Sequence, residues 1–146
     1  MTFKKLNFHH IFTRDWAFIR CVSEPNITIT GMAHFEASDN NRVLYTEKGL
    51  YQLHNDCQTC FQSHTYHVTP TTFTLLKSDG VLLHQVNVTD TMFPVRAQHD
   101  HLCNQDVYHC KWVFHDHDHF DMLYTVKGPK KDYQIKTVFS RIFQNG

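Results

Sequence analysis

The alternation of apolar and polar residues with a period of two is the feature that most constrains this fold. Between Val43 and Leu53, the odd positions carry most of the apolar and aromatic residues and the even positions carry mostly polar ones. The same alternation recurs in Asp106–Phe114 and in Tyr133–Phe143. Because successive side chains of a β-strand point to opposite faces, this pattern predicts strands with one buried face.

Six further segments are expected to be strands, and turn residues such as Ser78-Asp79-Gly80 separate them. They are Trp16–Val22, Ile27–Phe35, Cys60–Val68, Thr72–Lys77, Val81–Val88 and Met122–Gly128. A short helix is expected within Phe3–Thr13, and Thr91–Gln105 is expected to be a long connection without strand periodicity. About nine short strands at regular spacing predict a mainly β protein, a single antiparallel up-and-down β-barrel domain over residues 1–146, closed by Tyr133–Phe143.

The faces that carry the core aromatics also carry many polar side chains. These are Tyr45, Glu47, Gln62, His64, Tyr66, His84, Asp106, Tyr108, Thr137 and Arg141. Each buried polar group without a partner costs about 1–3 kcal/mol, so a dry sandwich core would rarely hold so many. A barrel whose interior holds water or a ligand satisfies them. The alternative is a self-satisfied polar network that binds nothing and only fixes the barrel.

Several short motifs occur in an order that resembles a known family. They are Gly31-x-Ala33-x-Phe35, Tyr45-x-Glu47-x-Gly49, Phe61 with Tyr66, Leu83-His84, His101-x-Cys103-x-x-Asp106-x-Tyr108, and Val126-x-Gly128-Pro129-x-Lys131-Asp132 with Thr137 and Arg141. Together they resemble a family of small single-domain proteins known only as a domain of unknown function. The resemblance implies a calycin-like barrel, related in architecture to lipocalins and fatty-acid-binding proteins. It implies no activity, substrate or cofactor.

The calycin resemblance also implies a role for Trp16 and Arg141. In lipocalin-like barrels, a Trp near the first strand packs under an Arg or Lys of the last strand and closes one end of the barrel. Trp16 and Arg141 occupy suitable positions in the chain. Arg14 departs from the lipocalin pattern, because it stands where a Gly usually precedes the Trp by two residues.

Parity places a set of polar and aromatic residues together in the barrel interior, as the candidate ligand-binding site. The set is Tyr45, Glu47, Tyr66, His84, Asp106, Tyr108 and Arg141, with His101 near the mouth. Apolar walls with a few directed polar groups are typical of small-molecule sites. A buried carboxylate must be paired or protonated, so Glu47 is expected to pair with Arg141, Arg20 or Lys131. One buried cation among aromatics favours a flat or acidic ligand.

Two other functions remain open from the sequence. The first is an enzyme that uses His101, Cys103, Asp106 or Glu47, since a thiol beside an imidazole can act as a nucleophile. The second is a metal- or haem-binding barrel, because the chain has thirteen His. The sequence identifies no cofactor.

Two cysteine and histidine motifs are interpreted without a metal. The single pair Cys57 and Cys60 would leave a tetrahedral zinc shell half empty, so no stoichiometric zinc is expected there. His115, His117 and His119 are expected at a solvent-facing hairpin tip, unnecessary for folding.

Charge and cysteine content narrow the partners and the compartment. Fourteen basic and fourteen acidic residues argue against non-specific nucleic-acid binding, which needs a concentrated basic surface. No apolar run approaches the ~20 residues of a membrane span. Five Cys and no apparent signal segment favour a reducing cytoplasm. The expected partner is a small molecule, and the alternatives of monomer and homodimer stay open.

Overall fold

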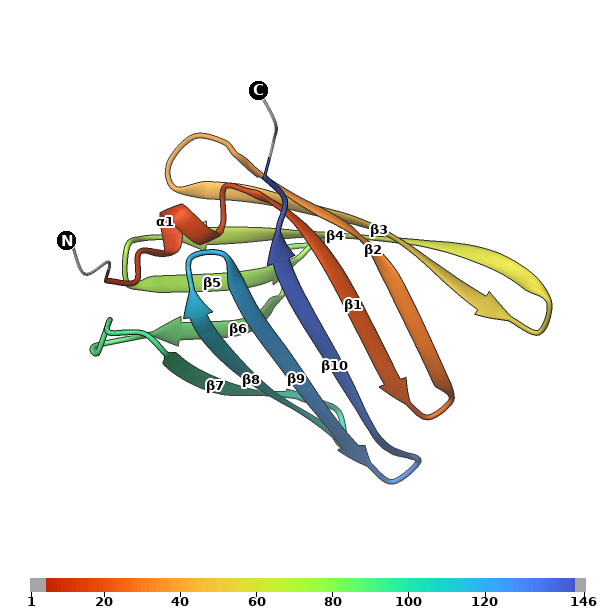
Figure 1. The fold of residues 1–146 in the computed structure, drawn as a ribbon. Helices are drawn as coiled ribbons and strands as arrows, with labels where there is room; N and C mark the ends of the chain where they lie inside the picture. Colours follow the sequence, from red (N-terminus) through yellow and green to blue (C-terminus); the bar gives the residue numbers. More distant parts are fainter. Residues whose placement is uncertain (1–4, 144–146) are drawn as a thin grey trace.

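The computed structural model describes residues 5–143 and contains one sheet of ten antiparallel strands with one short helix (Figure 1). The elements are α1 (Phe8–Ile11), β1 (Asp15–Ser23), β2 (Asn26–Ala37), β3 (Arg42–Leu53), β4 (Asp56–Val68), β5 (Thr72–Lys77), β6 (Leu82–Asn87), β7 (Val95–Cys103), β8 (Asp106–Asp116), β9 (His119–Gly128) and β10 (Lys131–Arg141). Strands that are consecutive in sequence pair with one another, except β6 and β7, which are not paired among the described residues. The first strand, β1, also pairs with the last, β10.

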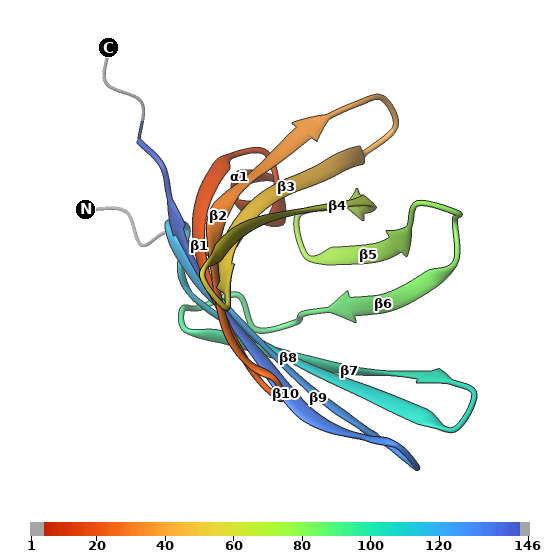
Figure 2. The ribbon, with the colours of Figure 1, turned by 90° about the vertical axis from the view of Figure 1, so that its right-hand side faces the viewer.

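The sheet curls into a barrel because its first and last strands pair. β10 lies between β9 and β1, and Phe18 stands opposite Phe139 across the β1–β10 ladder. The break lies between β6 and β7, which no strand pairing joins in the described residues. Figure 2 shows these two strands following one another around the curled sheet. The predicted antiparallel barrel and the role of the last strand are confirmed, and the sheet is nearly closed, with a seam at β6–β7.

Helix α1 and its flanking residues close one end of the barrel (Figure 1). Phe8 and Phe12 are fully buried there, with ring centroids 4.9 and 5.0 Å from that of Phe73. The Asn7 side chain caps the helix by accepting a hydrogen bond from the backbone N–H of His9 at 2.9 Å. Trp16 anchors the helix by donating from Nε1 to the carbonyl of Ile11 at 3.1 Å. The aromatic core is therefore concentrated at this end.

The helix is shorter than the predicted Phe3–Thr13, and residues 3 and 4 of that range lie outside the described residues. It covers only Phe8–Ile11; Phe12, which follows it, is buried in the core, whereas Thr13 and Arg14 are exposed. No helix within residues 5–143 is long and apolar enough to span a bilayer.

Strand β7 was not expected from the sequence, which predicted a connection over Thr91–Gln105. The strand pairs along its whole length with β8. Its inner face begins with Val95 and Ala97 and continues with His99 and His101 in place of further apolar residues. The polar inner face removes the apolar alternation on which strand prediction depends.

Two glycines make room for an aromatic ring inside the barrel. Gly31 on β2 stands opposite Gly49 on β3. A Cβ at Gly31 would lie 2.8 Å from the Phe18 ring and 2.1 Å from the carbonyl oxygen of Lys48. The missing side chains allow Phe18 to pack against the sheet, where its ring lies 4.7 Å from the Arg20 guanidinium.

Candidate functional site

The barrel encloses a cavity of about 390 Å³ beyond the aromatic core that α1 covers. All ten strands contribute to its wall, which is mainly aromatic and aliphatic. The lining residues are Arg20, Phe35, Tyr45, Glu47, Gln62, His64, Tyr66, Leu75, Lys77, Leu83, His84, His101, Cys103, Tyr108, Phe120, Met122, Tyr124, Val126, Tyr133, Ile135, Thr137 and Phe139. Their inward position follows from strand parity, as the sequence predicted for the polar members.

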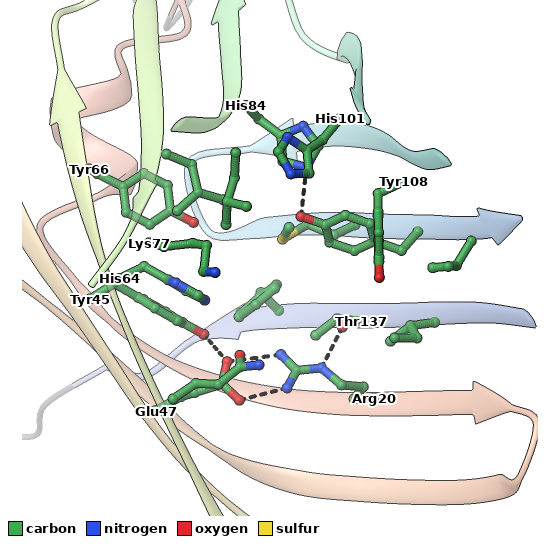
Figure 3. A pocket seen from close by; sticks show the side chains of 18 of the residues that line it. Arg20, Tyr45, Glu47, His64, Tyr66, Lys77, His84, His101, Tyr108 and Thr137 are labelled. Carbon is green, nitrogen blue, oxygen red and sulfur yellow. Dashed lines mark hydrogen bonds and ion pairs between the residues drawn. The ribbon is translucent and has the colours of Figure 1, made fainter. Parts of the chain in front are cut away.

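One wall of the cavity carries a buried ion pair (Figure 3). Arg20 on β1 donates from both terminal nitrogens to Glu47 on β3, at 2.6 and 2.9 Å. Its Nε donates to the hydroxyl of Thr137 on β10 at 2.9 Å. The Tyr45 hydroxyl donates to the same carboxylate. We call Arg20, Tyr45, Glu47 and Thr137 the charged wall.

Burial makes the pairing within the charged wall necessary. Only 5% of Glu47 is exposed, and an unpaired carboxylate at such a position would be strongly disfavoured. Burial lowers the pKa of Arg20, but the hydrogen bonds and charge of Glu47 outweigh it and raise the pKa. Burial and the Glu47 charge hold the pKa of Tyr45 well above its ordinary value. The charged wall therefore consists of an ion pair without net charge and the protonated hydroxyl of Tyr45.

A second polar cluster joins the two strands at the break in the sheet. His84 on β6 and His99 on β7 share a hydrogen bond between their Nδ1 atoms at 3.0 Å. The other ring nitrogen of His84 lies 2.8 Å from the hydroxyl of Tyr124 on β9. Side chains thus link β6 to β7 where backbone pairing is absent. We call His84, His99 and Tyr124 the histidine seam.

Two members of the seam, His84 and Tyr124, are uncharged. Burial, with His99 and His101 nearby, lowers the pKa of His84 to about 3. Burial and the neighbouring Cys110 raise the pKa of Tyr124 far above its ordinary value. At physiological pH, His84 is therefore an uncharged imidazole, able to donate one hydrogen bond and accept another.

Six of the eight predicted site residues line the cavity: Tyr45, Glu47, Tyr66, His84, His101 and Tyr108. The structure brings Glu47 to Arg20, one of its three expected partners. Asp106 does not line the cavity, contrary to the expectation of convergence. It pairs at the rim with Lys131 at 3.0 Å, and Lys131 also donates to the Tyr108 hydroxyl at 3.0 Å.

The expectation that Arg141 faces the pocket is wrong. Arg141 has the inward parity of β10 but lies at the end that α1 covers, where it pairs with Asp118 at 3.0 Å. It stands opposite Trp16 in the β1–β10 register. Within residues 5–143, its guanidinium makes its cation–π contact with Phe143, at 4.9 Å, rather than with Trp16. Trp16 contributes to closing the end through Ile11 instead.

Several lining residues were not among the predicted site residues. The inward position of Arg20 and Lys77 could have been predicted from the sequence, because each alternates in step with buried aromatic or aliphatic residues on its strand. Tyr124 lines the cavity but had no such signal, because β9 was predicted without an inward face. His99 belongs to the histidine seam and not to the cavity lining, and it had no signal because β7 was not predicted as a strand. His64 was placed on the inner face but was not chosen as a site residue.

Three of the four groups considered for catalysis, Glu47, His101 and Cys103, line the cavity, and Asp106 does not. Glu47 is held by Arg20, Asp106 is held by Lys131, and Cys103 is an exposed residue at the end of β7. Cys57 and Cys60 are three residues apart on β4, so their side chains leave opposite faces of the strand. No group of three or more His, Cys, Asp or Glu among residues 5–143 is arranged to hold a metal ion.

The histidines of the β8–β9 turn are not equivalent. His115 and His119 are exposed, and they pair with Asp121 and Asp116. His117 differs from the expectation, because it is half-buried against the chain before α1. Its Nε2 accepts a hydrogen bond from the backbone N–H of Asn7 at 3.2 Å, and its ring lies 4.9 Å from that of Phe93.

Comparisons with known proteins agree with the barrel architecture. A family described as a family of unknown function (DUF6314) matches residues 12–141. No curated protein matches the chain.

Solved structures with this fold include natural and designed barrels. The S-type phycobiliprotein lyase CPES from Guillardia theta is 7% identical, with 96% of this chain and 95% of that chain covered and a TM-score of 0.68. A de novo designed fluorescence-activating β-barrel is 11% identical, with 94% and 99% covered and a TM-score of 0.53. The redesigned barrel mFAP1 bound to DFHBI is 10% identical, with 90% and 95% covered and a TM-score of 0.51. With identities this low, the TM-scores above 0.5 show a shared fold and nothing more.

Proposed function

The chain belongs to the DUF6314 family, whose function is unknown, and we propose that its barrel binds a small, flat or anionic molecule in the interior cavity. The observation that carries the proposal is the cavity itself, with about 390 Å³ of space inside apolar walls. Small-molecule sites are commonly of this size and have a few polar groups directed inward. The charged wall, the histidine seam and Tyr108 supply such groups.

The cavity favours ligand binding over the alternative of a purely structural polar network. A network that only fixed the barrel would pair its own members and leave the interior filled. Here the Arg20–Glu47 pair is satisfied, yet open space remains beside it. Nδ1 of His64 is buried without a hydrogen-bond partner among the residues that the structure describes.

The solved barrels of the same fold add support of a general kind. The redesigned barrel mFAP1 was solved with DFHBI bound, so this architecture accommodates a small molecule. Fold alone does not determine function, and the argument therefore rests on the cavity of this chain.

The test is native mass spectrometry of the protein purified from its own cells. We expect a bound species that is lost when the cavity is filled by Ile135→Trp. The matched control is Lys136→Trp, which places the same side chain on the outer face of β10. No bound mass in the wild-type protein, or the same bound mass in a folded Ile135→Trp variant, would contradict the proposal.

A further inference from the structure

Among residues 5–143, three charged residues line the cavity, and two of them neutralise each other. Arg20 and Glu47 form the bidentate pair, and Lys77 is the third. An acidic ligand that approached Arg20 would also approach the Glu47 carboxylate, and like charges at such distances repel. Each of the three Arg20 nitrogens already donates a hydrogen bond. The charged wall is therefore unsuited to hold an anion.

Lys77 is the lining cation whose charge is available. It is the last residue of β5, with the inward parity of Phe73 and Leu75, and Figure 3 shows its side chain beside His64. Its ion pair is with Asp79, at 3.9 Å, and both side chains are more than half exposed. Exposed pairs with this separation contribute little, so a ligand can replace Asp79 as the partner.

His64 stands opposite Lys77 in the β4–β5 register and supplies a second polar group. Its ring is parallel to that of Tyr45, with an interplanar angle of 5° and centroids 6.0 Å apart. Burial lowers its pKa, so the imidazole is neutral. Because the buried Nδ1 has no acceptor within the described residues, the single ring proton is better placed on Nε2. His64 then has one N–H to offer to a ligand.

We infer that Lys77 and His64 form an acid-binding subsite, and that the ligand is an aromatic or conjugated molecule with a single anionic group such as a carboxylate. This inference rests on the proposed ligand-binding function. The ammonium of Lys77 balances the charge of the acid, and the His64 N–H donates a hydrogen bond to it. The aromatic walls contact the body of the ligand. Among the described lining residues, the weakly paired ammonium of Lys77 matches one negative charge, whereas a second charge would be left uncompensated near Glu47.

The test uses two fluorescent probes with the same ring system, pyrene-1-carboxylic acid and pyrene-1-carboxamide, titrated into the protein at pH 7.5. The wild type is expected to bind the acid about tenfold more tightly than the amide, as one charge-assisted hydrogen bond provides. Lys77→Gln should remove this preference. His64→Phe keeps the ring beside Tyr45 and should reduce it severalfold. Lys111→Gln, an exposed position on β8, removes the same charge elsewhere and should change nothing.

The outcomes separate this inference from the proposed function. Equal binding of the two probes by the wild type, or a preference that survives in Lys77→Gln, would overturn the acid subsite and leave the cavity as a binding site. If neither probe binds, the compound recovered by native mass spectrometry decides. A neutral compound overturns the subsite, an acid supports it, and no compound overturns the proposed function together with this inference.

Discussion

The charged wall and the histidine seam bury polar groups inside the same barrel by different means. The charged wall lies on β1, β3 and β10, which belong to the continuously paired part of the sheet. It holds one positive and one negative charge, which balance. The seam lies where β6 and β7 have no strand pairing among the described residues, and its His84 and Tyr124 are uncharged. The strand pairing of β1, β3 and β10 fixes the positions of the side chains in the charged wall. At the seam, side-chain hydrogen bonds instead connect β6 to β7.

Because of this difference, we expect the charged wall to be a rigid region of the barrel and the histidine seam to be a region that opens more easily. Removing Arg20 or Glu47 from the charged wall leaves the other charge buried without its partner, but the surrounding ladders remain. Removing His84 leaves no charge, but it removes the hydrogen bonds that link β6 to β7 and β9. The wall should therefore be the more costly region to disrupt, and the seam should be the region that opens locally.

The largest effect is expected from Glu47→Gln. The substitution leaves the Arg20 guanidinium buried without a counter-charge, which should cost about 3–5 kcal/mol of unfolding free energy. Urea denaturation measures it. Replacing both partners, as Arg20→Met with Glu47→Leu, should restore much of the loss, because no unpaired charge remains. A loss below about 1 kcal/mol in the single variant would show that water already compensates the pair.

A smaller loss, about 2–3 kcal/mol, is expected from His84→Phe. The ring shape is kept, but two hydrogen bonds are lost and the Tyr124 hydroxyl and the His99 ring lose their partner. Amide hydrogen exchange should accelerate in β6 and β7 and remain slow in β1 to β3. Uniform acceleration in all strands would contradict a local role for the seam. The control is Gln85→Ala, the outward-facing neighbour of His84 on the same strand.

The pH dependence of the unfolding free energy tests the contribution of His84 to the histidine seam. The folded-state pKa of His84 is about 3, below the ordinary value of 6.5, so below pH 6.5 the unfolded chain binds a proton that the folded chain does not. This contribution is present in full above pH 6.5 and is lost as the pH falls towards 3. By pH 5 the loss should reach about 2 kcal/mol. Burial lowers the pKa of His64 in the same direction.

The control for this prediction is the His84→Phe variant, which lacks the titrating group. Its unfolding free energy, measured by urea denaturation between pH 7.5 and pH 5, should fall less steeply than that of the wild type. Equal slopes would assign the acid sensitivity to other groups.

The smallest effect is expected from histidines on the outer surface. His115→Ser and His119→Ser should each change stability by no more than about 0.5 kcal/mol, since both side chains are exposed. His117→Ser should cost about 1 kcal/mol, because it removes the acceptor of the Asn7 N–H before α1. Thermal melts of the three single variants compare them directly. Equal effects would mean that His117 does not fix the helix.

The alternation along each strand predicted which side chains face the barrel interior, but not where along the barrel axis each of them lies. Tyr45, Glu47 and His84 were placed inside because each alternates in step with buried aromatics, and all three line the cavity. Arg141 has the same parity and is nevertheless absent from the cavity, since alternation carries no information about which end of a strand meets α1. The choice of Arg20 over Lys131 as the partner of Glu47 depends on strand order, which is a long-range property.

The histidine seam could not be predicted from the alternation of apolar and polar residues either. Detection of a strand relied on apolar residues at every second position, and His99 and His101 replace them on β7. The polar residues that make the seam chemically distinctive are thus the ones that hid the strand.

A closed barrel has a diameter set by its number of strands and their stagger, because every strand is hydrogen-bonded to two others. Among residues 5–143 the ladder is interrupted between β6 and β7, so strand pairing does not close the circumference there. The separation of these two strands is set by side chains, chiefly His84 and His99. A change of width at the β6–β7 seam would therefore break side-chain hydrogen bonds but no strand pairing among residues 5–143, which distinguishes this interior from that of a fully closed barrel.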